Sequence, residues 1–327
     1  MLPFSVFGLI ATPAGHLANG YDRDVDTIEW LLQSDPAISW QAMRDLTDAS
    51  REAIAAQRAR IPQMGLGAKI LAQQGEDGSW HRGDAPAWMP TLYTLLLLRS
   101  TGLDAKEPAV QSAMNRLEAG FRWHADFGAK PFFEGEVEPC INGGTLALGA
   151  YFGHPKENLA LRLLSEQLED GGWNCDAPKS TRSSFHSTIC VLEGLLEYER
   201  AVGSAPKITE ARRRGEEYLL KRSLFRRLAT GNAANMEFLL LAFPPRYHYD
   251  VLRGLEYFRI ANVQPEARMQ EAVAIIRSKQ QSDGRWLLEA SYDEALAFPF
   301  DETIGEPSRW NTLRALRVLR WFGSGAA

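Results

Sequence analysis

The chain has 327 residues, of which 45% are hydrophobic and 24% are charged, and these values exclude a disordered or fibrous protein. Its 36 basic and 41 acidic residues give a net charge of −5, so the composition offers no reason to expect nucleic acid as a partner. With three cysteines, no positively charged leader and no apolar run of membrane-spanning length, we expect a cytoplasmic protein without an integral membrane segment.

Apolar residues recur at helical spacing along most of the chain, and no alternating segment is long enough to predict a β-strand. The pattern therefore predicts an all-α protein. In chain order, the predicted helices cover residues 27–32, 38–46, 51–60, 68–71, 91–98, 108–118, 142–152, 159–168, 185–198, 208–221, 249–260, 265–278 and 311–321.

A short polar motif of the form Q-x-x-D-G-x-W occurs three times, at residues 73–80, 167–173 and 280–286. Each copy follows an apolar helix and precedes another. The Asp-Gly or Gly-Gly pair supplies a helix stop with a positive-φ turn, the glutamine can bond free backbone groups, and the tryptophan can pack under the turn. These tryptophans are therefore expected to stabilise turns rather than to take part in catalysis.

The three motifs resemble the QW repeats of squalene and oxidosqualene cyclases, and similar turns occur in protein prenyltransferase β subunits. The resemblance covers residues 65–322 and implies an α/α toroid, in which two rings of helices surround a central cavity. We therefore divide the chain into an N-terminal helical extension, 1–64, and a toroid domain, 65–327. The resemblance implies little about the reaction, because one fold hosts many activities.

In a toroid, the starts of successive inner helices meet at one mouth of the cavity, so polar residues that are distant in sequence would meet there. Cys140, Cys175 and His186 are the candidate ligands of a zinc ion, because thiolate and imidazole are ligands that zinc prefers. Glu138 or His248 would be the fourth ligand or a proton-transfer group. The alternative is that the cysteines are small core residues and the histidine is structural.

The prenyltransferase resemblance implies the same zinc site. Glu138-Pro139-Cys140 is similar to the family's D-x-C pair, with glutamate in place of aspartate. The segment 184–187 is similar to its F-Y-H-T segment, which holds the histidine ligand. Cys140 and His186 are closer in sequence than the corresponding ligands of that family.

Acidic and aromatic residues near the same helix starts are further candidates. Glu138, His248 and Asp250 are candidate catalytic groups for proton transfer, although His248 and Asp250 can equally cap the helix that follows them. The acidic run from 134 to 138 can equally be a solvated loop. The candidate substrate-binding residues are Glu134, Glu136, Asn142, Arg309 and Trp310.

Three functions remain open. The first is a prenyltransferase- or cyclase-like enzyme, a zinc-dependent transferase that activates a thiol or prenyl-type substrate in the cavity, with a second subunit not excluded. The second is a metal-free terpenoid cyclase or isoprenoid-binding protein with a dry, apolar pocket. Asp22, Asp24 and Asp26 lack the adjacent pair of the cyclases' D-x-D-D acid and read as a helix-start charge cluster. The third is a non-catalytic scaffold for a peptide or partner.

Overall fold

The computed structural model describes residues 20–203 and 205–324, and within them the regular structure is helical, with isolated β-bridges in place of strands. The predicted all-α class is confirmed. The α-helices are α1 (Gly20–Leu32), α2 (Pro36–Leu46), α3 (Arg51–Arg58), α4 (Gly65–Leu71), α5 (Trp88–Thr101), α6 (Pro108–Gly120), α7 (Pro139–Tyr151), α8 (Glu157–Ser165), α9 (Phe185–Val202), α10 (Pro206–Leu220), α11 (Val251–Ile260), α12 (Gln270–Ser278) and α13 (Arg309–Ser324). Each predicted helix is present, with ends shifted by a few residues.

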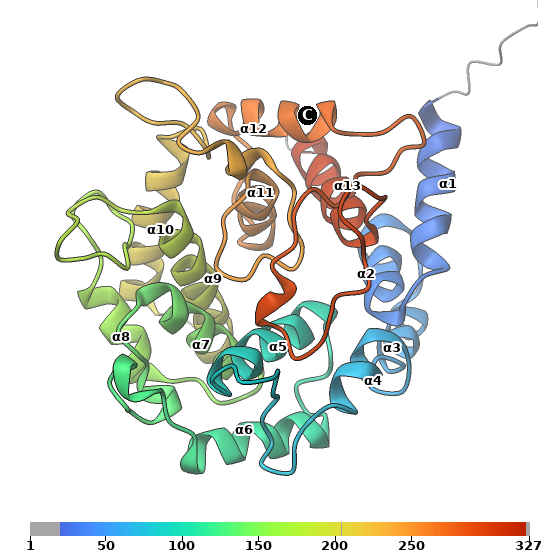
Figure 1. The fold of residues 1–327 in the computed structure, drawn as a ribbon. Helices are drawn as coiled ribbons and strands as arrows, with labels where there is room; N and C mark the ends of the chain where they lie inside the picture. Colours follow the sequence, from blue (N-terminus) through green and yellow to red (C-terminus); the bar gives the residue numbers. More distant parts are fainter. Residues whose placement is uncertain (1–19, 204, 325–327) are drawn as a thin grey trace, which may run out of the picture.

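The helices follow one another once around a ring, so that the last helix, α13, lies beside α2 (Figure 1). Helices α5, α7, α9, α11 and α13 contact one another in that order, and α2 contacts both α13 and α4. Helices α6, α8, α10 and α12 lie outside them (Figure 1). We interpret this arrangement of inner and outer helices as the α/α toroid.

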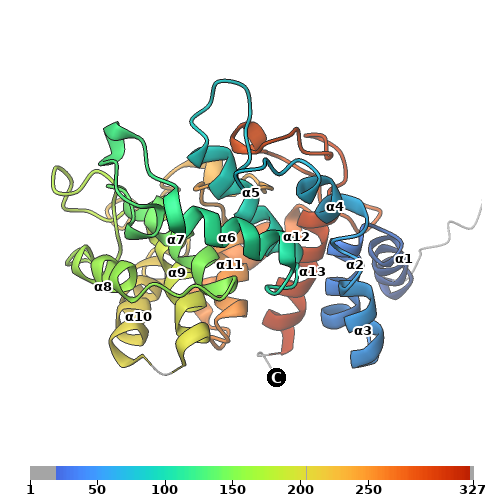
Figure 2. The ribbon, with the colours of Figure 1, turned by 90° about the horizontal axis from the view of Figure 1, so that it is seen from below.

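The inner helices run in the same direction through the ring. Figure 2 shows long loops gathered at one end of the ring, and the end of α13 at the other. The starts of α7 and α9 lie together, because Cys140 of α7 contacts Cys175, which in turn contacts Ser187 of α9. The N-terminal ends of α7 and α9 therefore lie at the same end of the ring.

The segment predicted as an N-terminal extension packs into the same hydrophobic core as the rest of the chain. The indole of Trp40 in α2 donates a 2.7 Å hydrogen bond to the carbonyl of Thr101, at the end of α5. In α1, Asp26 is exposed, as expected for a charge cluster, whereas the side chains of Asp22 and Asp24 lie outside the described part. The division at residue 64 stays a prediction.

The three polar motifs form the same buried turn, which we call the Gln–Trp turn. Trp80, Trp173 and Trp286 are fully buried, and each indole N–H donates to a carbonyl ten residues earlier, at 2.7 to 2.9 Å. Each tryptophan's backbone N–H also donates to a threonine hydroxyl of the next helix at 3.0 to 3.1 Å. The turn therefore ties the end of one helix to the start of the next.

The glutamine of each turn acts as the sequence predicts. The amides of Gln74, Gln167 and Gln280 donate to the carbonyl four residues later, at 2.7 to 3.2 Å. The first two also donate to a carbonyl of the following outer helix. Because these bonds satisfy backbone groups at a helix end, the turn-stabilising role of the motif is confirmed.

Glycines let α7 and α9 approach until their backbones touch. A Cβ atom added at Gly143 would lie 2.4 Å from the carbonyl oxygen of Cys190, and one added at Gly194 would lie 2.4 Å from the oxygen of Gly143. Both distances are far below van der Waals contact, so only glycine fits. This contact fixes α7, and with it Cys140, relative to α9.

None of the helices in the described residues is both long and apolar enough to cross a membrane.

Candidate functional site

The starts of α7 and α9 bring together the donor atoms of Glu138, Cys140 and Cys175, which all lie within 4.8 Å of one another. The two sulfurs are 3.1 Å apart, and Cys140 Sγ lies 3.6 Å from Glu138 Oε2. Glu138 is the N-cap residue of α7, and Cys140 is in its first turn. We call these three residues the thiol cluster.

Cys175 differs from Cys140 in its surroundings. It lies in the loop that leads into α9 and is half-buried, whereas Cys140 is buried. The hydrogen bond with Cys140 lowers the pKa of Cys175, and the nearby hydroxyl of Ser187, 3.2 Å from its sulfur, acts in the same direction. The same hydrogen bond and burial raise the pKa of Cys140. Cys140 therefore holds its proton more tightly than Cys175 does, and Cys175 is the thiol of the pair that ionises first.

His186, the third ligand predicted from the sequence, is outside the thiol cluster. Its Nδ1 atom accepts a 2.9 Å hydrogen bond from the backbone N–H of Tyr249, at the start of α11. Burial lowers the pKa of His186, and the charge of Arg253 adds to this effect. The structure thus places Glu138, rather than His186, with the two thiols. The histidine joins α9 to the segment before α11.

The acidic loop before α7 is organised by Asn142 rather than by solvent. The side chain of Asn142 accepts from the N–H of Glu136 at 2.8 Å and donates to its carbonyl at 2.9 Å. Glu136 is only 2% exposed, and its carboxylate accepts from the N–H of Glu138 at 2.8 Å. Burial raises the pKa of Glu136 to about 7. Glu134 is exposed, so of the three acids only Glu138 reaches a thiol.

Asp250 and His248, which are close in sequence, make different contacts in the structure. Asp250 is buried and caps α11, accepting from the N–H of Arg253 at 2.8 Å, although burial raises its pKa. The ring of His248 stacks on Tyr292, with centroids 3.5 Å apart. This confirms the capping alternative for Asp250, whereas His248 does not cap the helix.

Protonation of His248 is expected to destabilise the folded chain. Burial, His186 and two arginines lower its pKa to about 4, below the ordinary value near 6.5. Between these values the unfolded chain binds a proton that the folded chain does not, so stability is complete above pH 6.5 and falls as the pH drops toward 4. Because the ring is partly exposed, we expect a loss of about 1.5 kcal/mol. The free energy of unfolding, measured with denaturant at pH 7 and pH 4.5, should differ less between the two pH values in His248→Gln than in the wild type. A titration midpoint of His248 near pH 6.5 by NMR would contradict the expectation.

Arg309 and Trp310, at the start of α13, have packing partners. The guanidinium of Arg309 lies over the ring of Trp30, 4.5 Å from its centroid. Trp310 is 5% exposed and stacks on Phe243, with centroids 4.3 Å apart. Of the residues proposed from the sequence as site residues, only Trp310 lines the large cavity described next.

A cavity of about 1240 Å³ lies inside the ring, where the C-terminal ends of α5, α7, α9 and α11 meet, and it extends to Arg253 and Trp310 near the starts of α11 and α13. Tyr151 of α7, Arg200 of α9 and Arg259 of α11 line it, together with residues of α2, α3, α5 and α13. The thiol cluster is at the other end of these helices and does not line this cavity. The expectation that the zinc-site residues surround the mouth of the cavity is therefore wrong for this cavity, because the helices separate the two ends.

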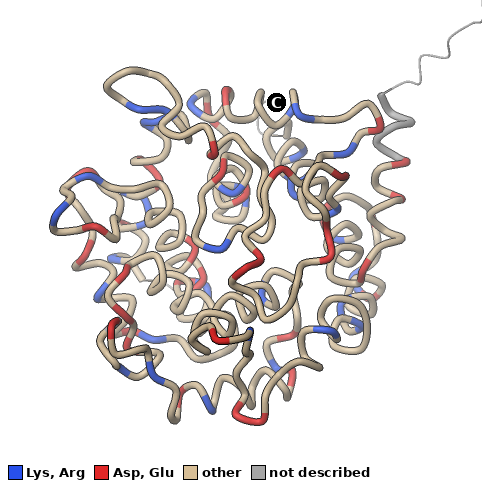
Figure 3. The backbone as a smooth tube through the Cα atoms, viewed as in Figure 1, with Lys and Arg blue, Asp and Glu red and all other residues tan. Residues whose placement is uncertain are grey.

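The cavity wall carries a belt of ion pairs that joins inner helices to one another. Arg99 of α5 pairs with Glu197 of α9 at 2.7 Å, and Arg253 of α11 pairs with Glu193 of α9 at 2.8 Å. Charged positions of both signs are visible on the helices inside the ring in Figure 3. We call this set, with the pairs described in the next paragraph, the ion-pair belt.

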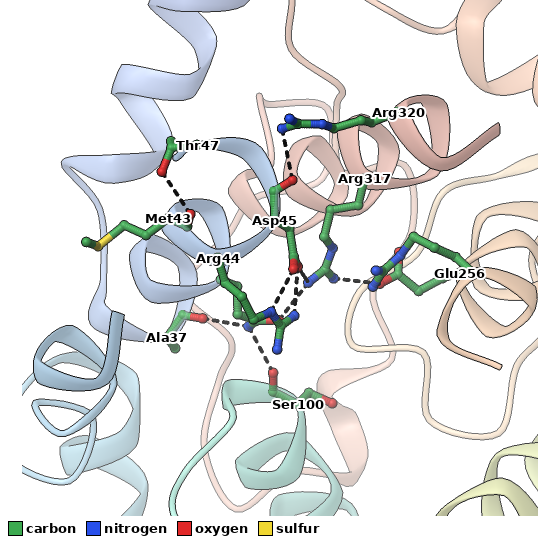
Figure 4. Close-up of polar contacts among 11 residues, drawn as sticks. Ala37, Met43, Arg44, Asp45, Thr47, Ser100, Glu256, Arg317 and Arg320 are labelled. Atoms are coloured by element: carbon green, nitrogen blue, oxygen red, sulfur yellow. Dashed lines mark hydrogen bonds and ion pairs between the residues drawn. The ribbon is translucent and has the colours of Figure 1, made fainter. Parts of the chain in front are cut away.

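Arg317 closes the belt between α11, α13 and α2. Its guanidinium donates to Glu256 at 2.6 Å and to Gln41 at 2.8 Å, and it lies 3.2 Å from Asp45 (Figure 4). Arg44 in turn pairs with Asp45 at 2.6 Å. The first and last helices of the ring are therefore held together by charge as well as by apolar packing.

The charges that line the cavity have an excess of arginine. Nine arginines and six acidic residues line it, whereas the whole chain has a net charge of −5. Among the described residues, Arg51, Arg58, Arg200 and Arg314 have no carboxylate within 4.0 Å. Arg58 and Arg200 donate instead to the carbonyls of Gly102 and Ile260, at the ends of α5 and α11. Part of the excess of arginine thus balances the negative C-terminal ends of the helix dipoles.

A central cavity is expected from the sequence, but the charged residues that line it are not among the predicted site residues, although the sequence contains a signal for them. Glu193 and Glu197 are four residues apart in a helix with many apolar residues, and Arg314 and Arg317 are three apart. Such spacing places both charges on one helix face. Charged residues on the face that packs inward predict a polar interior.

Comparisons with known proteins identify no relative of this chain. No protein-family model matches the sequence, and no curated protein is significantly similar to it. The functional argument therefore depends on the fold and on the geometry of the thiol cluster and the cavity.

Proposed function

We propose that the protein is an enzyme that binds a zinc ion through Glu138, Cys140 and Cys175 and acts on a thiol or prenyl-type substrate. The observation that supports the proposal is the convergence of two sulfurs and a carboxylate within 4.8 Å. Two thiolates and one carboxylate are ligands that zinc accepts, and three protein ligands leave one position for water or substrate.

The spacing of the donor atoms fits one zinc ion. Ligands about 2.3 Å from zinc in a tetrahedron place two sulfurs about 3.8 Å apart. The sulfurs of Cys140 and Cys175 are 3.1 Å apart, and Cys140 Sγ is 3.6 Å from Glu138 Oε2. A small outward shift of Cys175, which lies in a loop, therefore gives the required spacing.

The chain's own groups determine how such a site would work. A bound zinc ion lowers the pKa of a thiol and polarises an electrophile. Cys175 is half-buried, so a substrate would approach the cluster from the side of this loop. Glu136, with a pKa of about 7 and a carboxylate bonded to the N–H of Glu138, is placed to exchange a proton next to the cluster near neutral pH.

The cavity favours a second candidate function, the binding of an anionic small molecule. Arg314 is 5% exposed and lines the cavity. It donates its hydrogen bonds to neutral oxygens of Ala242 and Asn311, and the nearby carboxylates act on it only through their charge. Guanidinium groups of this kind bind carboxylates and phosphates well. The charged wall does not favour the metal-free terpenoid cyclase, for which we expected a dry, apolar pocket.

Purified full-length protein is expected to contain close to one zinc ion per chain, and Cys140→Ala and Cys175→Ala are expected to lose it. Metal content should be measured by mass spectrometry on protein prepared without a metal-affinity tag. His186→Ala is the matched control, because the structure places this residue outside the thiol cluster, and it should retain the metal. Absence of zinc from protein kept reduced and free of chelators would refute the zinc function, and the anion-binding candidate would then lead.

A further inference from the structure

The three cysteines of the chain are free, and they are in unlike environments. The sulfurs of Cys140 and Cys175 are 3.1 Å apart, although the residues are 35 positions apart in sequence. Cys190 is buried in α9, where it contacts the carbonyl of Tyr247 and the guanidinium of Arg253, each at 3.6 Å. The chain thus holds one close pair of thiols and one separate thiol that serves as an internal control.

The pair combines a fixed sulfur with a more accessible one. Cys140 is in the first turn of α7, which Gly143 and Gly194 lock against α9. Cys175 lies in the loop before α9 and is half-buried. Bonded sulfurs are about 2.05 Å apart, so the two atoms must approach by about 1 Å. A movement of this size is within reach of a loop side chain.

We infer that Cys140 and Cys175 form a redox modification site, which peroxides oxidise to an intramolecular disulfide and which dithiols reduce again. The thiolate of the accessible Cys175 attacks one peroxide oxygen, the O–O bond breaks, and the products are a sulfenic acid and water once a proton is taken up. The Cys140 thiol then attacks the oxidised sulfur, the S–S bond forms, and a second water leaves. Two thiols lose two electrons and two protons, and the peroxide is reduced to two waters.

The disulfide uses the same two sulfurs that would hold zinc. The effect of oxidation on the zinc site therefore rests on the proposed function. Once the S–S bond has formed, neither sulfur is a thiolate, and Glu138 remains as the single ligand of the cluster. Metal binding and disulfide formation therefore exclude each other, and oxidation would switch off the site. Formation of the disulfide itself does not require that the chain binds zinc.

The test is to treat the full chain with hydrogen peroxide, with and without added zinc, and to count its thiols after denaturation. We expect the reactive thiols to fall from three to one per chain, with a mass loss of about 2 Da and a peptide that links Cys140 to Cys175. Dithiothreitol should restore all three thiols. Cys190→Ser should form the same link, whereas Cys175→Ser should not form it and should keep its remaining thiols.

Two results would overturn the inference. One is oxidation of Cys175 to a sulfinic acid while Cys140 remains a thiol, and the other is a link that includes Cys190. The zinc function is tested separately by its metal content. A chain that forms the disulfide but contains no zinc refutes the proposed function and leaves the redox site intact. A chain that binds zinc, but forms no link under peroxide after the zinc has been removed, refutes the redox site and leaves the proposed function intact.

Discussion

Gly194→Ala is expected to destabilise the protein by about 3 kcal/mol, because the added methyl group meets backbone rather than a flexible side chain. The new Cβ would lie 2.4 Å from the oxygen of Gly143 and 3.0 Å from its carbonyl carbon. To relieve this overlap, α9 and α7 must move apart along their contact. Packed interiors resist such a shift. Urea unfolding, followed by circular dichroism, measures the change in the free energy of unfolding.

Gly144→Ala is the matched control, because Gly144 is in the same pair of helices but faces a different neighbour. Its added Cβ would meet the methyl end of Leu96 at 3.1 Å, and that side chain can rotate away. Alanine also has a higher helix propensity than glycine, by about 1 kcal/mol. We therefore expect Gly144→Ala to change stability by less than about 1 kcal/mol in either direction. Equal losses in the two variants would show that the backbone contact is not what makes position 194 sensitive.

The helices and turns of this fold are largely predictable from the sequence, because their signals are local. Trp173 lies ten residues after Leu163, whose carbonyl it binds, and the Gly171 that makes the turn has a φ of 99°. The hydrogen bonds of Trp173, and the bond of Gln167 to Gly171, join residues that are at most 15 positions apart in sequence. A pattern repeated three times therefore indicates both the helix boundaries and the role of the tryptophan.

The thiol cluster was predictable only in part, since its members come from separate helix starts. The expectation that helix starts meet correctly predicts that Cys140 lies near Cys175. It does not say which of the other residues at these helix starts point toward the cluster. Side-chain direction decides the rest. His186 turns toward Tyr249, and Asp250 turns back to cap its own helix. These rotamers depend on neighbours that the sequence does not identify.

The charged lining of the cavity was not predicted, for a different reason. Its charged lining residues are scattered over several helices, where no short motif draws attention to them. Glu256 is among apolar residues in α11, and Arg317 has a similar position in α13. Each charge by itself is compatible with an exposed helix face. Only the ring places them opposite each other, 2.6 Å apart and almost without solvent.

Glu256→Leu and Arg317→Met are each expected to destabilise the protein by about 3 kcal/mol, because each leaves a buried charge with fewer partners. Glu256 is 8% exposed and Arg317 is 7% exposed. The double variant should lose at least 1 kcal/mol less than the sum of the single losses, because it removes both charges of the pair. Urea unfolding of the four proteins measures this coupling, and additive losses would contradict a direct interaction.

Glu271→Gln is the exposed counterpart, since Glu271 pairs with Arg226 on the surface, and it should change stability by less than about 1 kcal/mol. Acid should also weaken the buried pair. Burial raises the pKa of Glu256, but Arg317, Arg259 and Arg314 together lower it below its ordinary value. Its contribution to stability is therefore complete above that ordinary value and is lost as the pH falls through the lower value of the folded chain. Because the belt joins α13 to α2, this loss would open the ring where its two ends meet, and Glu256→Leu should unfold with a weaker dependence on acid than the wild type.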